Sequence, residues 1–222
     1  MNIHRPSSSG NGIVIGVVSD IDDPIGLNRL QVDFPHLGGM TSAWARLVSP
    51  MAGGGRGVVF RPEIGDEVLV VYEQGDPRRP YILGALWSTV DRPPEGDPDR
   101  TANNWRFIRS RSGHLVKLDD TPGQERIEIE DKDGLRRLVI DAGGDRVELT
   151  AESGTITIEA TAGDVHVRAP QATVHVEARE LVAEVTESAR IKATTISLEA
   201  SADLNIKAGG VLSLKGSQIT LN

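Results

Sequence analysis

The fold is decided by the stretch that begins Ile156-Thr157-Ile158 and returns as Val165-His166-Val167 and Val174-His175-Val176. Apolar residues come here in pairs around one polar residue, and each pair follows the last after nine positions. Side chains alternate across an extended strand, so each pair predicts a short strand with one apolar face. Small and polar residues between the pairs suit turns. The sequence therefore predicts a repeat of strand-plus-turn units.

The same pattern extends outward in both directions, from Arg126 to Asn222. After Leu138 the step is nine residues, and it falls to eight and then seven near the C-terminus. The other pairs are Ile127/Ile129, Leu138/Ile140, Val147/Leu149, Ile196/Leu198, Leu204/Ile206, Leu212/Leu214 and Ile219/Leu221. Between Arg179 and Thr195 the pattern is blurred, and the expected inward positions are Leu181, Val185 and Ile191.

A single chain does not contain enough large apolar side chains to bury the apolar surface of this repeat. Phe, Tyr and Trp are absent after Phe107, and a single thin ribbon exposes both edges and half of its apolar surface. Several identical chains wound around one axis would remove the edges and hide the apolar pairs. The alternative is an antiparallel meander lying on another domain, but no other part of the chain is large enough to cover it.

Length and composition limit the classes of function. The chain has 222 residues, which allows one or two domains, and its formal net charge of -8 argues against a nucleic-acid partner. It contains no cysteine, so disulfides and cysteine zinc sites are excluded. Residues 1–12 contain no apolar run, so we expect no signal peptide, and we expect a chain made in the cytoplasm that leaves only if a machine carries it.

Four parts follow one another along the chain. Residues 1–12 are expected to be a flexible arm, and residues 88–104, rich in proline and charge, an extended linker. Residues 13–87 carry five or six short apolar runs with Gly/Pro turns and no helical pattern, which favours a small OB-type barrel. The runs are 13–18, 29–34, 44–48, 58–60, 67–72 and 80–86. Residues 105–222 form the repeat region.

Several motifs in the first domain come in a fixed order. They are Asp23-Pro24, Asn28-Arg29-Leu30-Gln31-Val32-Asp33-Phe34-Pro35, Ser42-Ala43-Trp44-Ala45-Arg46-Leu47, Ser49-Pro50-Met51-Ala52-Gly53, Arg61-Pro62-Glu63-Ile64-Gly65-Asp66-Glu67-Val68-Leu69-Val70 and Gly75-Asp76-Pro77-Arg78-Arg79-Pro80. Together they resemble the OB domain of contractile-injection spike proteins, namely VgrG proteins of type VI secretion and phage baseplate assembly protein V. Ser110-Arg111-Ser112-Gly113-His114 and Leu118-Asp119-Asp120 resemble the start of that family's β-helix.

The resemblance implies an all-β chain: an N-terminal OB-fold barrel followed by an intertwined homotrimeric triangular β-helix over residues 105–222. It implies a structural spike at the centre of a baseplate, driven through a target envelope when a sheath contracts. The implied partners are a hub protein above the OB domain, which we expect to be another chain, a PAAR-type tip protein, and transiently the target membrane. The expected trimer-core residues are Ile156, Ile158, Val165, Val167, Val174, Val176, Ile196, Leu198, Leu204 and Ile206. The expected tip-docking residues are Leu212, Leu214, Ile219 and Leu221.

No catalytic, cofactor or metal residues are predicted. Gly53-Gly54-Gly55-Arg56-Gly57 lacks the Lys-Ser/Thr ending of a phosphate loop and is expected to be a hairpin tip. Glu63, Asp66 and Glu67 are expected to form a structural loop rather than a catalytic carboxylate pair, and His114 has no neighbouring nucleophile. Some spikes of the family end in a His-X-His iron site, but no histidine follows His175 here.

His166 and His175 lie between inward positions and are expected to point outward, at equivalent places in successive units. That spacing allows a metal ladder, but an exposed pair of imidazoles is the interpretation we favour.

Two other classes of function remain open. A left-handed β-helix acyltransferase would need a hexapeptide repeat, whereas the steps here are seven to nine residues. An OB-fold binder of nucleic acid or sugar would need exposed aromatic and basic residues, and the aromatic content is 4%.

Overall fold

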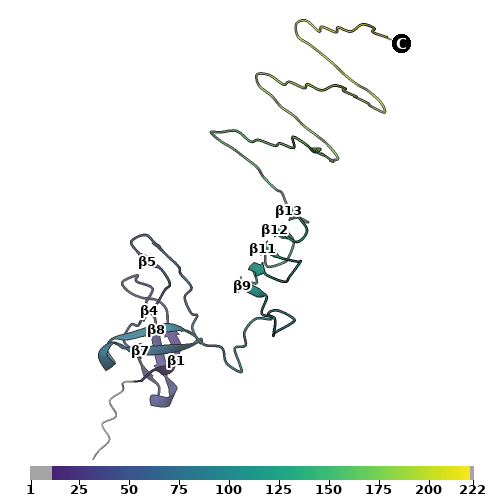
Figure 1. Cartoon of the computed structure of the whole chain (residues 1–222). Helices are drawn as coiled ribbons and strands as arrows, with labels where there is room; N and C mark the ends of the chain where they lie inside the picture. The colour runs from purple at the N-terminus through teal and green to yellow at the C-terminus, as the bar shows by residue number, and fades with distance from the viewer. Residues whose placement is uncertain (1–11, 221–222) are drawn as a thin grey trace, which may run out of the picture. The chain divides into compact units, whose positions relative to one another are not determined.

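The computed structural model describes residues 12–220, and the regular structure within that range is almost entirely β (Figure 1). Two 3-10 turns, η1 (Pro35–Leu37) and η2 (Glu73–Gly75), are the exceptions among these residues. This confirms the all-β class. The chain divides into a unit that ends at Thr157 and a unit that begins at Ile158. Most of the predicted N-terminal arm, residues 1–11, lies outside the described residues.

The first domain is a curled six-stranded sheet with strand order β3-β2-β1-β7-β8-β4. Its strands are β1 (Val14–Asp20), β2 (Gln31–Phe34), β3 (Met40–Thr41), β4 (Arg46–Leu47), β7 (Glu67–Tyr72) and β8 (Pro80–Ala85). Leu30, just before β2, and Ala45, just before β4, exchange two backbone hydrogen bonds of 3.0 and 2.8 Å. Because β4 is at one end of the strand order and β2 is next to the other end, this bridge closes the sheet into the predicted OB-like barrel.

Alternation along the strands builds the barrel core. Val32 and Phe34 in β2 and Val68 and Val70 in β7 point inward and are buried. The complete cluster of buried residues is Val18, Leu30, Val32, Phe34, Ala45, Val68, Val70 and Ile82. Register shifts between Val18 and Asp20 and between Leu69 and Val70 interrupt the ladders. Irregularities of this kind increase the local twist, which helps so short a sheet to curl.

The glycine run after β4 forms the predicted hairpin. Strands β5 (Ala52–Gly53) and β6 (Arg56–Gly57) pair antiparallel, and Gly55 at the tip has a φ of 69°. A positive φ is what a tight hairpin turn requires, and glycine adopts it without steric cost. The expected strand at 58–60 is absent, because Val58, Val59 and Phe60 follow β6 without a ladder partner.

A second sheet follows the linker and has the order β13-β12-β11-β10-β9. Its strands are β9 (Trp105–Arg109), β10 (Leu115–Asp119), β11 (Arg126–Glu130), β12 (Arg136–Asp141) and β13 (Arg146–Ala151), all antiparallel to their neighbours. The start of the repeat region is therefore an antiparallel sheet formed within one chain. The expected triangular β-helix over residues 105–222 stays a prediction, and its first five strands already pair within the single chain.

The turns explain why in-chain pairing stops after β13. Every hairpin of this sheet contains a residue with positive φ: Gly113, Gly123, Gly134 and Asp145. The last such residue is Gly154, and none occurs among residues 155–220. Tight two-residue hairpin turns favour a positive φ, and the later bends lack one.

Residues 155–220 run as extended segments joined by bends, without strand pairing inside the chain (Figure 1). The bends fall at 152–154, 161–163, 170–172, 179, 186–187, 194, 201–202, 209–210 and 217. Between them lie eight segments of six residues, which we number 1 to 8: 155–160, 164–169, 173–178, 180–185, 188–193, 195–200, 203–208 and 211–216. The periodic units that the sequence predicts are present, but in the single chain they are not strands of a sheet.

A candidate assembly surface

The sheet β9–β13 has one apolar face, and that face is open to solvent. Alternation places Ile127 and Ile129 of β11 on this face, opposite Leu118 and Val116 of β10. The apolar face consists of Ile108, Val116, Leu118, Ile127, Ile129, Leu138, Ile140, Val147 and Leu149. Eight of these nine side chains are exposed, and Leu138 is half-buried. A hollow of about 550 Å³ lies over part of this face.

The exposed apolar area is large enough to stabilise an assembly. Fully burying one aliphatic side chain contributes about 1.5–3 kcal/mol, and about half of that remains unrealised here. Covering nine such side chains therefore contributes roughly 7–14 kcal/mol per chain. A contiguous apolar patch of this kind on a folded protein is typical of an interaction surface.

The opposite face of the same sheet carries charge, and part of it is buried. Lys117, Asp119 and Glu128 are each less than 7% exposed. Lys117 Nζ lies 2.8 Å from Glu128 Oε2 and 4.2 Å from the centre of the Trp105 ring. Arg126 Nε lies 2.6 Å from Glu128 Oε1, close enough for an ion pair but without hydrogen-bond alignment. Buried charges persist where each has a partner, and here each carboxylate has two cations nearby.

The electrostatics of this cluster favour the ionised state of Asp119. Burial acts to raise the pKa of Asp119, but hydrogen bonds from Thr121 and the charges of Lys117 and Arg126 outweigh it. The pKa of Asp119 is therefore below its ordinary value. Its Oδ1 accepts the Thr121 hydroxyl at 2.6 Å and the Thr121 N–H at 3.1 Å. This cluster was not predicted from the sequence, although charged residues recur at alternate positions of β10 and β11.

The expected trimer-core residues occupy one set of positions in the extended segments. Ile156/Ile158 are the second and fourth residues of segment 1, and Val165/Val167 have the same positions in segment 2. All ten expected core residues are exposed in the single chain. Between Arg179 and Thr195, where the apolar pattern is less regular, the expected inward residues follow the same rule. Leu181, Val185 and Ile191 also take even positions of their segments. Even positions share one side of an extended segment, so the apolar side is unpartnered throughout.

The expected tip-docking residues continue this arrangement. Leu212 and Leu214 are the second and fourth residues of segment 8, and both are exposed. Ile219 follows the last bend and is exposed as well. Leu221 lies outside the described residues.

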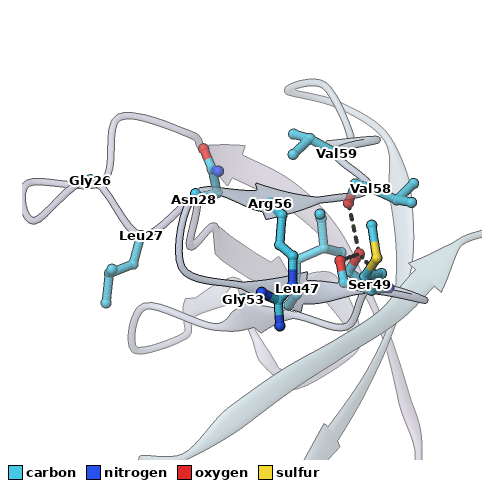
Figure 2. A pocket seen from close by; sticks show the side chains of 13 residues that line it. Gly26, Leu27, Asn28, Leu47, Ser49, Gly53, Arg56, Val58 and Val59 are labelled. Atoms are coloured by element: carbon cyan, nitrogen blue, oxygen red, sulfur yellow. Dashed lines mark hydrogen bonds between the residues drawn. The ribbon is translucent and has the colours of Figure 1, made fainter.

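The barrel carries a groove of about 780 Å³ beside the β5–β6 hairpin (Figure 2). Neither a carboxylate nor a histidine lines it, and Arg56 is its one charged residue among those the structure describes. Ser49 Oγ lies 2.9 Å from the Met51 carbonyl and 2.7 Å from the Val58 carbonyl, so its proton is directed to the backbone (Figure 2). A serine without a base is not an activated nucleophile. This groove therefore offers no acid–base chemistry.

The other side chains considered as catalytic candidates have structural roles. Asp66 Oδ2 accepts the Glu63 N–H at 2.9 Å, which caps the turn around Gly65, where φ is 98°. This supports the interpretation of these carboxylates as part of a structural loop. His114 Nδ1 accepts the Lys132 N–H at 3.1 Å, so one ring nitrogen is already used by the backbone.

His166 and His175 are exposed, and each faces a carboxylate of its own segment. His166 Nε2 lies 3.6 Å from Asp164 Oδ2, and His175 Nε2 lies 3.8 Å from Glu177 Oε2. Within the described range, no three His, Asp or Glu residues come together in a way that could hold a metal ion. That range also has no helix long and apolar enough to cross a membrane.

Asp23 and Arg29, which belong to two motifs of the barrel, contact each other directly. Asp23 accepts the backbone N–H groups of Leu27 and Arg29 at 2.8 and 3.2 Å, and its Oδ1 lies 2.6 Å from Arg29 Nη2. The guanidinium of Arg29 holds the pKa of Asp23 well below its ordinary value. The Asp23 side chain is 2% exposed, so these contacts fix the loop that leads into β2. Their role is structural.

Comparison with known proteins agrees with this architecture. Residues 14–87, which make up the barrel, match the family model described as the type VI secretion system/phage-baseplate injector OB domain. The boundaries coincide with the start of β1 and a point just after β8.

Several spike proteins of Pseudomonas aeruginosa are similar to part of the chain. The type VI secretion system spike protein VgrG4b is 32% identical over 91 residues, which is 39% of this chain and 11% of that protein. VgrG5 is 29% identical over 129 residues, 55% of this chain and 15% of that protein. VgrG1a is 30% identical over 118 residues, 53% of this chain and 17% of that protein. The chain thus spans less than a fifth of the length of these relatives.

Proposed function

We propose that this chain is the structural central spike of a contractile injection machine, because residues 14–87 match the type VI secretion system/phage-baseplate injector OB domain and part of the chain is similar to VgrG spike proteins. The observation that carries the proposal is the open apolar side that follows the barrel, on the β9–β13 sheet and along the extended segments. In this proposal the chain is at the baseplate centre of a phage tail, tail-like particle or type VI-like apparatus, below the tube.

The proposed assembly is a homotrimer whose residues 105–222 form a triangular β-helix. Three chains around one axis would cover the apolar face of each β9–β13 sheet and supply the missing ladder partners of the later segments. Backbone N–H and C=O groups without a ladder partner require either water or another strand, and pairing between chains satisfies them. The same pairing removes exposed strand edges and makes a stiff rod.

Light scattering and native mass spectrometry test the trimer directly. We expect the purified full chain to have the mass of three copies. A mass of one chain would contradict the proposed assembly and favour either the acyltransferase or the OB-fold binder.

The proposed action is mechanical: contraction of a sheath drives the spike through the envelope of the target cell. The function needs no enzyme chemistry, and the surroundings of Ser49, Asp66 and His114 support this. The proposed partners are a baseplate hub protein above the OB domain, transiently the target membrane, and a PAAR-type tip protein. No nucleic-acid partner is proposed, because the chain carries a net charge of -8.

Injection by the assembled machine tests the mechanical role. A host that carries Val167→Asp in place of the native chain should assemble no functional baseplate and should fail to kill or infect target cells. His166→Asp, one residue away on the opposite side of the segment, should retain activity. Full activity of Val167→Asp would contradict a role for this side of the chain in the spike.

The end of the chain is the proposed docking site for the tip protein. Leu212, Leu214 and Ile219 present apolar side chains there, and we include Leu221 in the proposed site. Removing Ser217 to Asn222 should abolish binding of a PAAR-type protein in a pull-down while leaving the OB domain folded. The matched control replaces the outward Ser213 and Lys215 by alanine and should bind normally. Unchanged binding after the truncation would refute this assignment.

A further inference from the structure

The barrel carries a second hollow, of about 330 Å³, that the proposed function does not use. Five of its eight lining residues are arginine or aromatic, namely Arg29, Trp44, Arg46, Arg79 and Tyr81. Arginine, tryptophan and tyrosine are the residue types that most often carry the binding energy of protein interfaces. The hollow is therefore a candidate binding site, and it shares no residue with the apolar side of residues 105–222.

Closure of the barrel brings two arginines to this hollow. Leu30 and Ala45 exchange backbone hydrogen bonds as an isolated antiparallel bridge. The residues flanking such a bridge pair across it on the other face of the sheet, so Arg29 and Arg46 are cross-strand neighbours on the outside of the barrel. Like charges directly opposite each other are destabilising. The stability of this arrangement therefore depends on negative partners nearby.

The two arginines differ in the partners that the chain gives them. Arg29 is neutralised, because its Nη2 lies 2.6 Å from Asp23 Oδ1. Arg46 is exposed, and among the residues that the structure describes no carboxylate lies at ion-pair distance from it. Its Nη2 donates a hydrogen bond to Tyr81 Oη, and its guanidinium carbon lies 4.6 Å from the centre of the Tyr81 ring. Arg46 is thus held by a neutral group and keeps an uncompensated positive charge.

A chain of contacts fixes the orientation of Arg46. Tyr81 Oη donates a hydrogen bond to Glu73 Oε2 at 2.8 Å, and Arg79 Nη1 lies 3.5 Å from Glu73 Oε1. Glu73 therefore offsets the charge of Arg79 and also holds the hydroxyl group that contacts Arg46. A side chain that is ordered before binding loses less conformational entropy when a ligand arrives. Arg46 is in this sense preorganised to bind an anion.

Charge and shape define the class of ligand. A guanidinium binds a carboxylate through two parallel N–H···O bonds, and one uncompensated arginine matches one carboxylate. A nucleic-acid strand carries a phosphate at every nucleotide, and Glu73 at the same hollow would repel such a polyanion. Leu27, Trp44 and Pro80 add apolar surface to the lining. The hollow therefore suits a single carboxylate beside an apolar group.

We propose that this hollow binds an acidic segment of a partner protein. Arg46 holds the carboxylate of an aspartate or glutamate of that segment, and Leu27 and Trp44 pack against an apolar residue next to it. This inference goes beyond the proposed function. It does not depend on the trimer, because all the lining residues belong to the barrel.

Fluorescence anisotropy on the full chain tests the site. The probe is a fluorescein-labelled octapeptide of alternating glutamate and leucine, used at low ionic strength, where charge interactions are least screened. The native chain should bind it. Arg46→Gln should raise the Kd by about 10-fold or more, because a charge-assisted hydrogen-bonded pair is lost. Arg46→Lys should bind with intermediate affinity, since lysine keeps the charge but cannot form two parallel bonds.

Two controls separate the site from general charge attraction. Arg56→Gln removes the same charge from another exposed arginine of the barrel, in β6, and should leave the Kd unchanged. The same octapeptide with glutamine in place of glutamate should not bind. The proposal is overturned by equal losses from Arg46→Gln and Arg56→Gln, by equal binding of the two peptides, or by a native chain that does not bind the acidic peptide.

A third probe, a labelled oligothymidine, tests the other class of macromolecule. Tighter binding of oligothymidine than of the acidic peptide, lost in Arg46→Gln, would identify a nucleic-acid site and overturn the proposal. Circular dichroism verifies that each variant is folded, and if Arg46→Gln is not, the comparison of Arg46→Lys with the native chain decides. Light scattering on the same samples keeps the two proposals apart. Peptide binding by a single chain would reject the trimer alone, and a trimer that does not bind would reject this site alone.

Discussion

Substitution of Val167 by aspartate addresses the central physical claim about this chain. Val167 is the fourth residue of segment 2, and its side chain is 73% exposed in the single chain. In the single chain, a carboxylate at this exposed position would hardly change the free energy of unfolding. The proposed trimer forbids it, because three copies would bring three carboxylates together near one axis.

The size of the effect follows from burial. Losing the valine removes about 1.5–3 kcal/mol of apolar burial per copy. Full burial raises the pKa of a carboxyl group by up to about 3–5 units, and each unit corresponds to about 1.4 kcal/mol. Three copies enter one assembly, so the total is on the order of 20 kcal/mol, above the roughly 5–15 kcal/mol that stabilises an ordinary protein.

The sign of the pH dependence is specific to this mechanism. Since burial raises the pKa of the new carboxyl group above its unfolded value, the folded state binds the proton more tightly. The variant should therefore come closest to the native protein below about pH 4, where the group is protonated in both states. The free energy of unfolding of the variant, relative to that of the native protein, should fall as the pH rises from about 4 to the raised pKa of the new carboxyl group.

Thermal unfolding followed by circular dichroism, together with light scattering at pH 5 and pH 8, measures both effects. The control is His166→Asp, which introduces the same group one residue away on the opposite side. We expect a heat-resistant trimer from the control and dissociated chains from Val167→Asp at pH 8. A heat-resistant trimer from Val167→Asp, or equal losses from the two variants, would refute the assignment of the inward side.

Three further predictions concern parts of unit 1. Ile82→Ala should lower the free energy of unfolding of the barrel by about 2–5 kcal/mol in a urea titration, because Ile82 is fully buried, whereas Leu83→Ala at an exposed position should change it little. Gly16→Ala should destabilise the barrel by about 1–3 kcal/mol in the same titration, since its Cβ would clash with Val32 Cγ1; an unchanged midpoint would contradict this tight contact. Asp119→Asn should lower the melting temperature at pH 7, and the difference from the native protein should shrink as the pH falls below about 4, because the lowered pKa of Asp119 gives a stabilisation that is lost on protonation; a difference independent of pH would refute this role.

Much of the barrel could be predicted from local sequence. The alternation in Glu67–Tyr72 and Arg29–Phe34 identified β7 and β2, and the glycine run at Gly53–Gly57 identified the β5–β6 hairpin. These predictions succeeded because period-two alternation and turn chemistry act over a few residues. The closure of the barrel between Leu30 and Ala45 joins residues distant in the chain, and no local pattern specifies it.

The position at which in-chain pairing ends was decided by the tertiary structure. Apolar pairs continue with the same spacing on both sides of Gly154, so the pattern alone does not distinguish Leu138/Ile140 from Val165/Val167. The structure separates them, because the last hairpin joins β12 and β13, and Gly154 is the last described residue with a positive φ. The same holds for the buried cluster of Lys117, Asp119, Arg126 and Glu128, whose members are charged in sequence and buried only once β10 and β11 pair.

By itself, the sequence determined the strand periodicity, the polar and apolar sides of each segment and the OB-type barrel. These properties depend on side-chain alternation and turn residues within a few positions of one another. The tertiary structure alone decided which strands pair within one chain, which charges become buried and which apolar side is left open. Those outcomes depend on backbone hydrogen bonds between distant residues, which a local pattern allows but does not choose.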